Sequence, residues 1–409
     1  MTIFRLSKPS NPDVIKYLTA SALIAFSFFG FVVVVFNLYL LRLGYDTRFI
    51  GITNGCTPIS FALTGILAGI LSKYRGVKKT TVTALVFLVL SIILIPFTQY
   101  LSTKEAQASI IFLRILSGSG LALFFVTLDP YLVSATTDKE RVFIFSLNAG
   151  IGVGSSFLGS VLAGIFPALI ANFIGTDVSS PLPFAYMIGL SGLFLIPAIP
   201  VILTSRETLT VTEDKQQSPA EISIKPILLI IVLLCLSNFL RAAGESTTRS
   251  FFNVYLELAM NETPRRIGFM MAAGRLAAMP AALLAHKLAA KIGKLRSAVL
   301  SIYCMAGGLV FTIIAPHWLI ATLGYGLTIS ARSMAQSLTS VVQMEIVPAR
   351  HRTIFAGALA LTGGAGFGGM AFLGGYLIPA IEFSGYYLLG AVACLLSAFL
   401  FKIYSRPHH

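Results

Sequence analysis

Long apolar segments, separated by short polar loops, follow one another along the whole chain. Twelve of them are long enough to cross about 30 Å of hydrocarbon as a helix. A helix is expected for each, because backbone groups inside a bilayer must satisfy their hydrogen bonds within the segment. The pattern therefore predicts an all-α membrane protein with twelve transmembrane helices. They are expected at residues 16–41, 48–72, 79–98, 107–134, 142–171, 183–204, 226–257, 266–289, 297–315, 318–347, 353–380 and 384–403.

The longest polar stretch separates the first six apolar segments from the last six. It covers residues 205–225 and is rich in acidic, amide and hydroxyl side chains, which is typical of a flexible linker. We therefore expect an N-terminal six-helix bundle at residues 1–204, a cytoplasmic linker at 205–225 and a C-terminal six-helix bundle at 226–409.

The two halves repeat each other in sequence at a nearly constant distance. Residues 36–40 have the sequence FNLYL, and residues 252–256, which lie 216 positions later, have the sequence FNVYL. Two pseudo-symmetric six-helix bundles around a central site are an architecture of secondary transporters. Further matches at nearly the same distance are Ile50-Gly51 with Ile267-Gly268, residues 71–79 with 288–296, and Arg114 with Arg332.

The charge distribution predicts the orientation of the chain in the membrane. Hydrophobic residues make up 56% of the 409 residues and charged residues only 11%, whereas soluble domains carry about 25% charged residues. The net charge of +14 arises mainly in short loops, with 20 Lys and Arg on the side of the termini and 5 on the other side. This asymmetry predicts that both termini are cytoplasmic, and it argues against nucleic-acid binding. Short loops and termini are typical of a multi-pass protein of a bacterial inner (plasma) membrane.

Three charged residues stand at intervals of four inside one apolar segment. They are Arg241, Glu245 and Arg249, and residues 227–240 before them carry no charge. An interval of four places them on one helix face. Ionisable groups at membrane depth are costly and by default indicate a function. The repeat aligns Glu245 with Phe29, at the centre of the first apolar segment, which predicts that Glu245 lies at the membrane midplane.

The repeat also shows that this charge belongs to one half only, since the matching positions Ala25, Phe29 and Val33 are apolar. Two flanking cations favour the ionised form of Glu245 and leave a local positive excess. Arginine presents a fork of donors that suits carboxylate or phosphate. The alternative is a salt-bridged cluster that only packs helices together.

The positive excess suggests an anion site, and further polar groups at apolar depth are candidate members of it. We expect an anionic or zwitterionic substrate held mainly by Arg241, with Arg249 or Arg332 assisting, and with Asn37 as a further contact. Arg332 and Arg275 each either line the cavity or pair with an acid on a neighbouring helix. Asn37 either contacts substrate or hydrogen-bonds a neighbouring helix.

Two segments resemble motifs of the major facilitator superfamily. Residues 69–79, GILSKYRGVKK, are similar to the family's G-x-L-A-D-R-x-G-R-K loop, and residues 114–122, RILSGSGLA, to its R-x-x-x-G-x-G-x-A pattern. Lys73 stands where the family has an aspartate that latches the outward-facing state. The resemblance covers essentially the whole chain and implies the superfamily's twelve-helix fold with rocker-switch alternating access. The expected conformational loop motif comprises Gly69, Lys73, Arg75, Gly76, Lys78 and, in the second copy, Gly293.

The resemblance also implies roles in coupling and gating. Arg114 matches an arginine that the family links to proton coupling. Asp129 and Glu345 lie near the cytoplasmic ends of spans four and ten, before basic turns that contain Arg141 and Arg352. Similar acids in the family pair with basic loop residues to stabilise one access state. Proton carriage is the alternative for Asp129.

These observations predict a secondary transporter of a small organic solute, favouring an anion or zwitterion, with proton coupling. The alternatives are a multidrug or metabolite exporter that works by proton antiport, in which aromatic residues dominate binding and Glu245 selects cations, and a non-transporting sensor on the same fold. The sequence contains no motif of an enzyme, cofactor site or metal site. The expected partners are a small-molecule substrate, protons and the lipid bilayer, and a monomer is expected.

Overall fold

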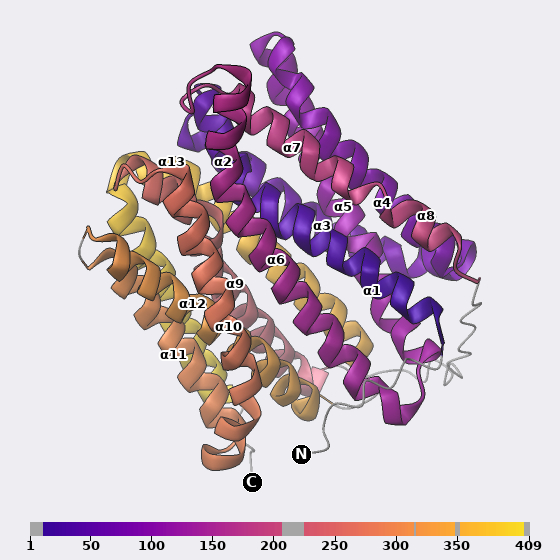
Figure 1. The fold of residues 1–409 in the computed structure, drawn as a ribbon. Coiled ribbons are helices and arrows are strands. Elements are labelled where there is room, and N and C mark those ends of the chain that lie inside the picture. The colour runs from indigo at the N-terminus through magenta and orange to yellow at the C-terminus, as the bar shows by residue number, and fades with distance from the viewer. Residues whose placement is uncertain (1–10, 207–224, 315, 348–351, 405–409) are drawn as a thin grey trace, which may run out of the picture.

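The structure is a computed structural model that describes residues 11–206, 225–314, 316–347 and 352–404, and every regular element in them is a helix. The helices of the first half lie together on one side of the molecule and those of the second half on the other (Figure 1). The all-α class is therefore confirmed. Within these ranges, the structure describes only the backbone at positions 70, 73, 138, 139, 142, 225–227, 282, 283, 344, 345, 352–354 and 404.

The first half contains six spans built from ten helical elements, because three spans are divided into two or three pieces. The first span combines α1, η1 and α2, the third α4 and η2, and the sixth α7 and α8. Their bounds are α1 (Asp13–Ile24), η1 (Ala25–Val32), α2 (Val33–Arg42), α3 (Thr47–Arg75), α4 (Val77–Leu94), η2 (Ile95–Tyr100), α5 (Thr103–Ala135), α6 (Asp138–Ile174), α7 (Leu182–Leu195) and α8 (Ala198–Leu203).

The second half is made of five described helices, of which the last is long enough for two spans. Its direction changes at Glu382, where the backbone has a φ of 59°. The bounds are α9 (Lys225–Leu258), α10 (Pro264–Ile292), α11 (Lys294–Ile313), α12 (Trp318–Ile346) and α13 (Arg352–Tyr404).

The helices of the described chain account for each predicted apolar segment. Nine candidate spans are apolar and long enough by themselves, and the bent pair Pro264–Ala281 and Leu284–Ile292, at 47°, makes a tenth. The span Phe355–Ile403 covers two predicted segments, and α12 covers the remaining one. The linker residues 207–224 lie outside the described residues, so the predicted domain boundaries stay a prediction.

The sequence repeat is also a repeat of helix ends. Asp46 accepts a hydrogen bond from the Phe49 N–H (3.0 Å) at the start of α3, and 217 positions later Thr263 accepts from the Arg266 N–H (3.4 Å) at the start of α10. Side-chain acceptors of this kind satisfy N–H groups that a helix start leaves free. The matched caps show that both halves use the same local structure.

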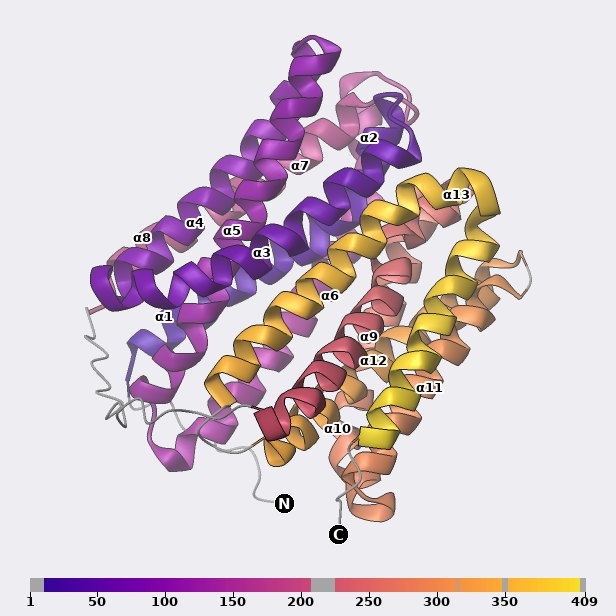
Figure 2. The ribbon, with the colours of Figure 1, turned by 180° about the vertical axis from the view of Figure 1, so that it is seen from behind.

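The two halves touch near one end of the bundle. We call the end at which α1 starts and α13 finishes the terminal side, and the opposite end, where α2 finishes and α3 starts, the distal side (Figure 2). Near the distal side a Cβ on Gly51 of α3 would lie 2.8 Å from backbone atoms of Gly375 of α13, and a Cβ on Gly268 of α10 would lie 2.5 Å from Cα of Gly164 of α6. Small residues permit such close helix contacts.

The helices α3 and α13 separate towards the terminal side. A Cβ on Gly65 of α3 would meet only Val126 of its own half, at 3.9 Å, and one on Gly357 of α13 would meet no atom within 4 Å. The hydrogen bonds between the halves that involve α2, α3 and α9 also lie on the distal side. In the described part of the chain, the two halves therefore contact each other at the distal side and are separated at the terminal side.

Candidate substrate cavity

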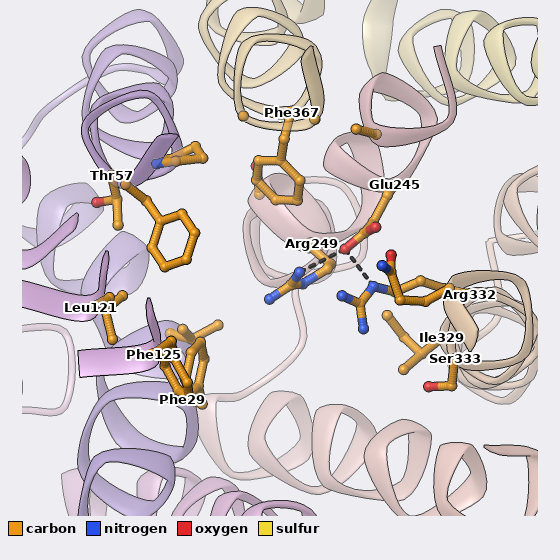
Figure 3. A pocket seen from close by; sticks show the side chains of 18 of the residues that line it. Phe29, Thr57, Leu121, Phe125, Glu245, Arg249, Ile329, Arg332, Ser333 and Phe367 are labelled. Atoms are coloured by element: carbon orange, nitrogen blue, oxygen red, sulfur yellow. Dashed lines mark hydrogen bonds and ion pairs between the residues drawn. The ribbon is translucent and has the colours of Figure 1, made fainter. Parts of the chain in front are cut away.

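A cavity of about 810 Å³ lies between the two halves. Its volume falls within the range of about 300–1,000 Å³ that is usual for small-molecule sites. Side chains from η1, α2, α3, α5 and α6 line it from the first half, and side chains from α9, α10, α12 and α13 line it from the second. Figure 3 shows both walls and the charged group on the second one.

Glu245 is the centre of that charged group and accepts from arginines on two helices. Its Oε1 lies 2.6 Å from Nη1 of Arg249, one turn along α9, and 2.5 Å from Nε of Arg332 on α12 (Figure 3). Its Oε2 lies 3.7 Å from Nη1 of Arg241, one turn before it. The predicted triplet therefore does share one helix face, and Arg332 joins it from another helix.

Arg241 is fixed by further polar contacts and is almost inaccessible, with a side chain 7% exposed. Its Nη2 donates to Oδ1 of Asn238 (3.0 Å) and to Oε1 of Gln336 (3.1 Å). The side chains of Arg249 and Arg332 are 32% and 31% exposed. The prediction that Arg241 is the main substrate contact stays a prediction, and the more accessible guanidinium groups are those of Arg249 and Arg332.

Arg275 lines the cavity and bridges the two halves from α10. Its Nη1 donates to the carbonyl oxygen of Phe29 in η1 and, at 3.4 Å, to that of Ser156 in α6. Of the two alternatives left open by the sequence, the structure places Arg275 in the cavity wall, where its Nη1 binds carbonyl oxygens rather than an acid of the described residues. Phe29 belongs to a π-helical segment, a departure from α-helix that is frequent at functional sites.

Arg114 lines the cavity from the first half but is buried, at 6% exposure. Its Nε donates to the carbonyl oxygen of Thr53 (3.4 Å), and its guanidinium carbon lies 4.5 Å from the ring centre of Phe36 and 5.8 Å from that of Phe28. Among the described residues, the cavity wall thus carries five arginines and one carboxylate, a formal charge of +4.

Two asparagines related by the repeat close the distal end of the cavity. Nδ2 of Asn37 donates to Oδ1 of Asn253 (2.9 Å) and to the carbonyl oxygen of Ser250 (2.8 Å), and Asn54 donates to the same carbonyl (2.9 Å). Sequence reasoning named Asn37 and missed Asn253, although the FNLYL and FNVYL repeat places them at matching positions. Asn37 as a substrate contact stays a prediction, and its amide is engaged with the second half.

Replacing both asparagines by alanine is expected to loosen this distal closure. The pair contributes buried hydrogen bonds between the halves, and each net hydrogen bond stabilises by about 0.5–1.5 kcal/mol. We expect a cysteine probe at Ser333, in a variant without the four native cysteines, to react faster from the distal side. A double-mutant cycle of Asn37→Ala and Asn253→Ala should show coupling, whereas independent effects on the reaction rate would contradict the pairing.

An ion pair between the halves adds to the closure. Arg42 at the end of α2 pairs with Glu257 of α9, with side chains only 12% and 15% exposed, and its guanidinium carbon lies 4.8 Å from the ring centre of Phe184. Sequence reasoning missed this pair, because Arg42 was counted as a loop charge. The available signal was that Arg42 and Glu257 follow the repeated FNLYL and FNVYL segments closely.

The predicted terminal gate is only partly described. Asp129 is exposed on α5 and makes no ion pair with the described residues, and Nη2 of Arg141 donates to the carbonyl oxygen of Val133 (3.2 Å). The side chains of Glu345 and Arg352 lie outside the described residues. The gate roles therefore stay predictions.

The predicted loop motif forms sharp turns in both halves. Gly76 has a φ of 82° and Gly293 a φ of 90°, a conformation that side-chain-bearing residues rarely adopt. Nζ of Lys78 donates to the carbonyl oxygen of Ser205 (2.8 Å), beyond the end of α8. Gly69 lies within α3 and Arg75 is exposed at its end, whereas the Lys73 side chain is outside the description.

The comparisons with known proteins agree with this architecture. The family model described as Major Facilitator Superfamily matches residues 17–331 and 234–409. No curated protein sequence matches the chain significantly.

Solved structures with the same fold include several transporters. The crystal structure of a point mutant of nucleoside transporter NupG has a TM-score of 0.77 and 13% identity, over 96% of this chain and 99% of that chain. The D-xylose-proton symporter has a TM-score of 0.70 and 16% identity, over 95% and 96%. The inward open conformation of the xylose transporter XylE from E. coli has a TM-score of 0.73 and 15% identity, over 95% and 94%. At such identities the likeness concerns the fold.

Proposed function

Since the chain belongs to the Major Facilitator Superfamily, and is therefore a multi-pass secondary transporter and not an enzyme, we propose that it carries a small organic anion or zwitterion. The observation that carries this proposal is that the described part of the cavity wall holds five arginines and one carboxylate. An organic cation in this cavity would meet a formal charge of +4, and like charges in a desolvated site repel one another. An anion instead finds donors that match its oxygen atoms.

We further propose that this conformation is inward-facing, which means that the cavity is open to the cytoplasm and closed on the opposite side. This part of the proposal rests on the distal closure by Asn37 and Asn253 and on the charge asymmetry that predicts cytoplasmic termini. Transport then requires the halves to rock, so that the distal contacts part and the terminal ends meet. The resemblance in fold to an inward open conformation of XylE supports this assignment.

We also propose that a proton gradient supplies the energy. The fold is shared with a D-xylose-proton symporter, and Arg114 stands at the position that the family links to proton coupling. Purified protein in liposomes is expected to accumulate a substrate anion faster when a pH gradient is imposed than without one. Equal rates with and without the gradient would remove proton coupling from the proposal and leave the anion class intact.

The substrate class is tested by replacing Arg332 with glutamine. The side chain keeps its polarity but loses its charge, and a hydrogen bond to a charged group contributes about 1.5–3 kcal/mol. We therefore expect affinity for organic anions to fall roughly 10-fold or more. The measurement is uptake into liposomes over a panel of anions, zwitterions and cations of similar size.

The matched control is Arg266→Gln, because Arg266 lies outside the cavity with a side chain 64% exposed. It should leave anion affinity unchanged. If cations are transported and anions are not, or if Arg332→Gln leaves the affinity for anions as in the unmodified protein, the proposed substrate class is wrong.

A further inference from the structure

The two walls of the cavity differ in chemistry. The wall from the first half is dominated by aromatic and aliphatic side chains, and Figure 3 shows Phe29, Phe125 and Leu121 opposite Arg249 and Arg332. The wall from the second half holds the carboxylate, four of the five arginines and most of the amides and hydroxyls. The phenylalanines of the first wall are Phe28, Phe29, Phe36, Phe61 and Phe125.

The few polar side chains of the first wall are already bound to the protein. Asn37 and Asn54 donate to a backbone carbonyl of the second half, and Oγ1 of Thr57 donates to the carbonyl oxygen of Arg114 (3.3 Å). Arg114 itself is buried beneath two aromatic rings. A ligand that touches this wall therefore meets mainly ring faces and edges.

Three phenylalanines of the first wall, Phe28, Phe29 and Phe125, contact one another in series. The ring centres of Phe28 and Phe29 lie 5.4 Å apart, those of Phe29 and Phe125 6.2 Å apart. Aromatic groups at such distances pack favourably. Phe29 and Phe125 are half-buried, so their remaining surface is available to a ligand in the cavity.

On the second wall, some N–H groups of Arg249 and Arg332 are available to a ligand. Arg249 uses Nη1 and Arg332 uses Nε to bind Glu245, and the structure gives no further hydrogen bond of these side chains to a described residue. Their remaining N–H groups point into the cavity (Figure 3). Planar guanidinium edges of this kind bind a carboxylate or phosphate.

The repeat makes the contrast sharper. Phe29 and Glu245 occupy matching positions of the two halves, 216 residues apart, and both line the cavity. One half presents an aromatic ring at this position and the other a carboxylate ringed by arginines. The two related surfaces therefore differ in the kind of ligand group that each can contact favourably.

From this asymmetry we infer that the substrate is an amphipathic organic anion. Its carboxylate or phosphate binds Arg249 and Arg332 on the second wall, and its aromatic or aliphatic body lies on Phe29 and Phe125 of the first wall. This inference rests on the proposed function, since it specifies which organic anions the transporter takes. Short anions with a polar body satisfy only one wall.

The test is a binding series on the full-length protein in lipid nanodiscs, measured by calorimetry. The ligands are butanoate, octanoate and 3-phenylpropanoate, succinate as an anion with a polar body, and octylammonium as a cation with the same number of carbon atoms as octanoate. We expect octanoate and 3-phenylpropanoate to bind at least 10-fold more tightly than succinate, and affinity to rise roughly three- to fourfold per methylene from butanoate to octanoate. Octylammonium should not bind at the concentrations at which octanoate binds.

Two variants distinguish binding of the apolar body of the ligand from binding of its anionic group. Phe125→Ala is expected to weaken octanoate and 3-phenylpropanoate about 10-fold or more and to leave succinate unchanged, because only the tail contacts the ring. Arg332→Gln should weaken all three anions. Phe173→Ala is the matched control, since Phe173 lies on the surface of α6 with 92% exposure, and it should change no affinity.

The outcomes distinguish this inference from the proposed function. Succinate that binds as tightly as octanoate, or an equal loss for succinate and octanoate in Phe125→Ala, overturns the amphipathic substrate and leaves the anion class standing. Octylammonium that binds while no anion does, or no binding of any of these anions, overturns both.

Discussion

Replacing Glu245 with glutamine is expected to destabilise the protein by about 3–5 kcal/mol. Glu245 is 4% exposed and is the only carboxylate among the described residues that line the cavity. Glutamine keeps the shape of the side chain but removes the charge that three arginines share. Arg241 is the costliest of them to leave without a counter-charge, because it is buried. The measurement is thermal and denaturant unfolding of the purified protein in a constant detergent.

The matched control is Glu382→Gln, an identical change at an exposed position of α13, which should alter stability by less than about 0.5 kcal/mol. A second replacement, Arg332→Gln in the Glu245→Gln background, should cost less than Arg332→Gln alone, because the pair no longer exists. If Glu245→Gln lowers stability no more than Glu382→Gln does, the charge of Glu245 does not stabilise the arginine cluster.

The spacing of the charges on α9 could be predicted from the sequence, whereas for Arg332 the sequence left cavity lining and pairing with an acid of a neighbouring helix as open alternatives. An interval of four residues fixes Arg241, Glu245 and Arg249 on one face of a helix, whatever surrounds it. Arg332 reaches the same carboxylate from α12, 87 positions away. That contact depends on how two separate helices are rotated and spaced, which is set by packing and not by the local pattern.

The repeat carried sequence reasoning further than single motifs did. It predicted matching turns, and Gly76 and Gly293 both have the positive φ that a sharp turn requires. It also held the signal for Asn253, the repeat partner of Asn37. It could not show that these two side chains bind each other, because the repeat relates positions within each half and says nothing of how close the two copies approach.

Apolar patterning also has a limit where a span carries function. Among the described helices, α12 is not among the candidate spans selected by hydropathy, although it coincides with a predicted segment. It presents Arg332, Ser333 and Gln336 to the cavity. The polar residues that build a binding wall lower the apolar signal of the helix that carries them.

Replacing Gly51 with leucine is expected to force the distal contact between the halves apart. A Cβ at this position would lie 2.8 Å from Gly375 Cα and from the Ala371 carbonyl oxygen, and these backbone atoms cannot turn away as a flexible side chain does. Overpacking of this kind costs about 1–3 kcal/mol. Because the clash exists only while the halves meet distally, it shifts the balance between access states by roughly 5- to 150-fold.

We therefore expect a variant that still folds but transports poorly and exposes its cavity on the distal side. The measurement is the reaction of a cysteine at Ser333 with an impermeant thiol reagent, in a background without the native cysteines, applied from each side of the membrane. Gly369→Leu on α13 is the matched control, since nothing lies within 4 Å of a Cβ there. Unchanged distal reactivity in Gly51→Leu would show that the close contact of α3 with α13 does not keep the cavity shut. Increased reactivity together with lost transport would identify this contact as the one that must open and close in each cycle.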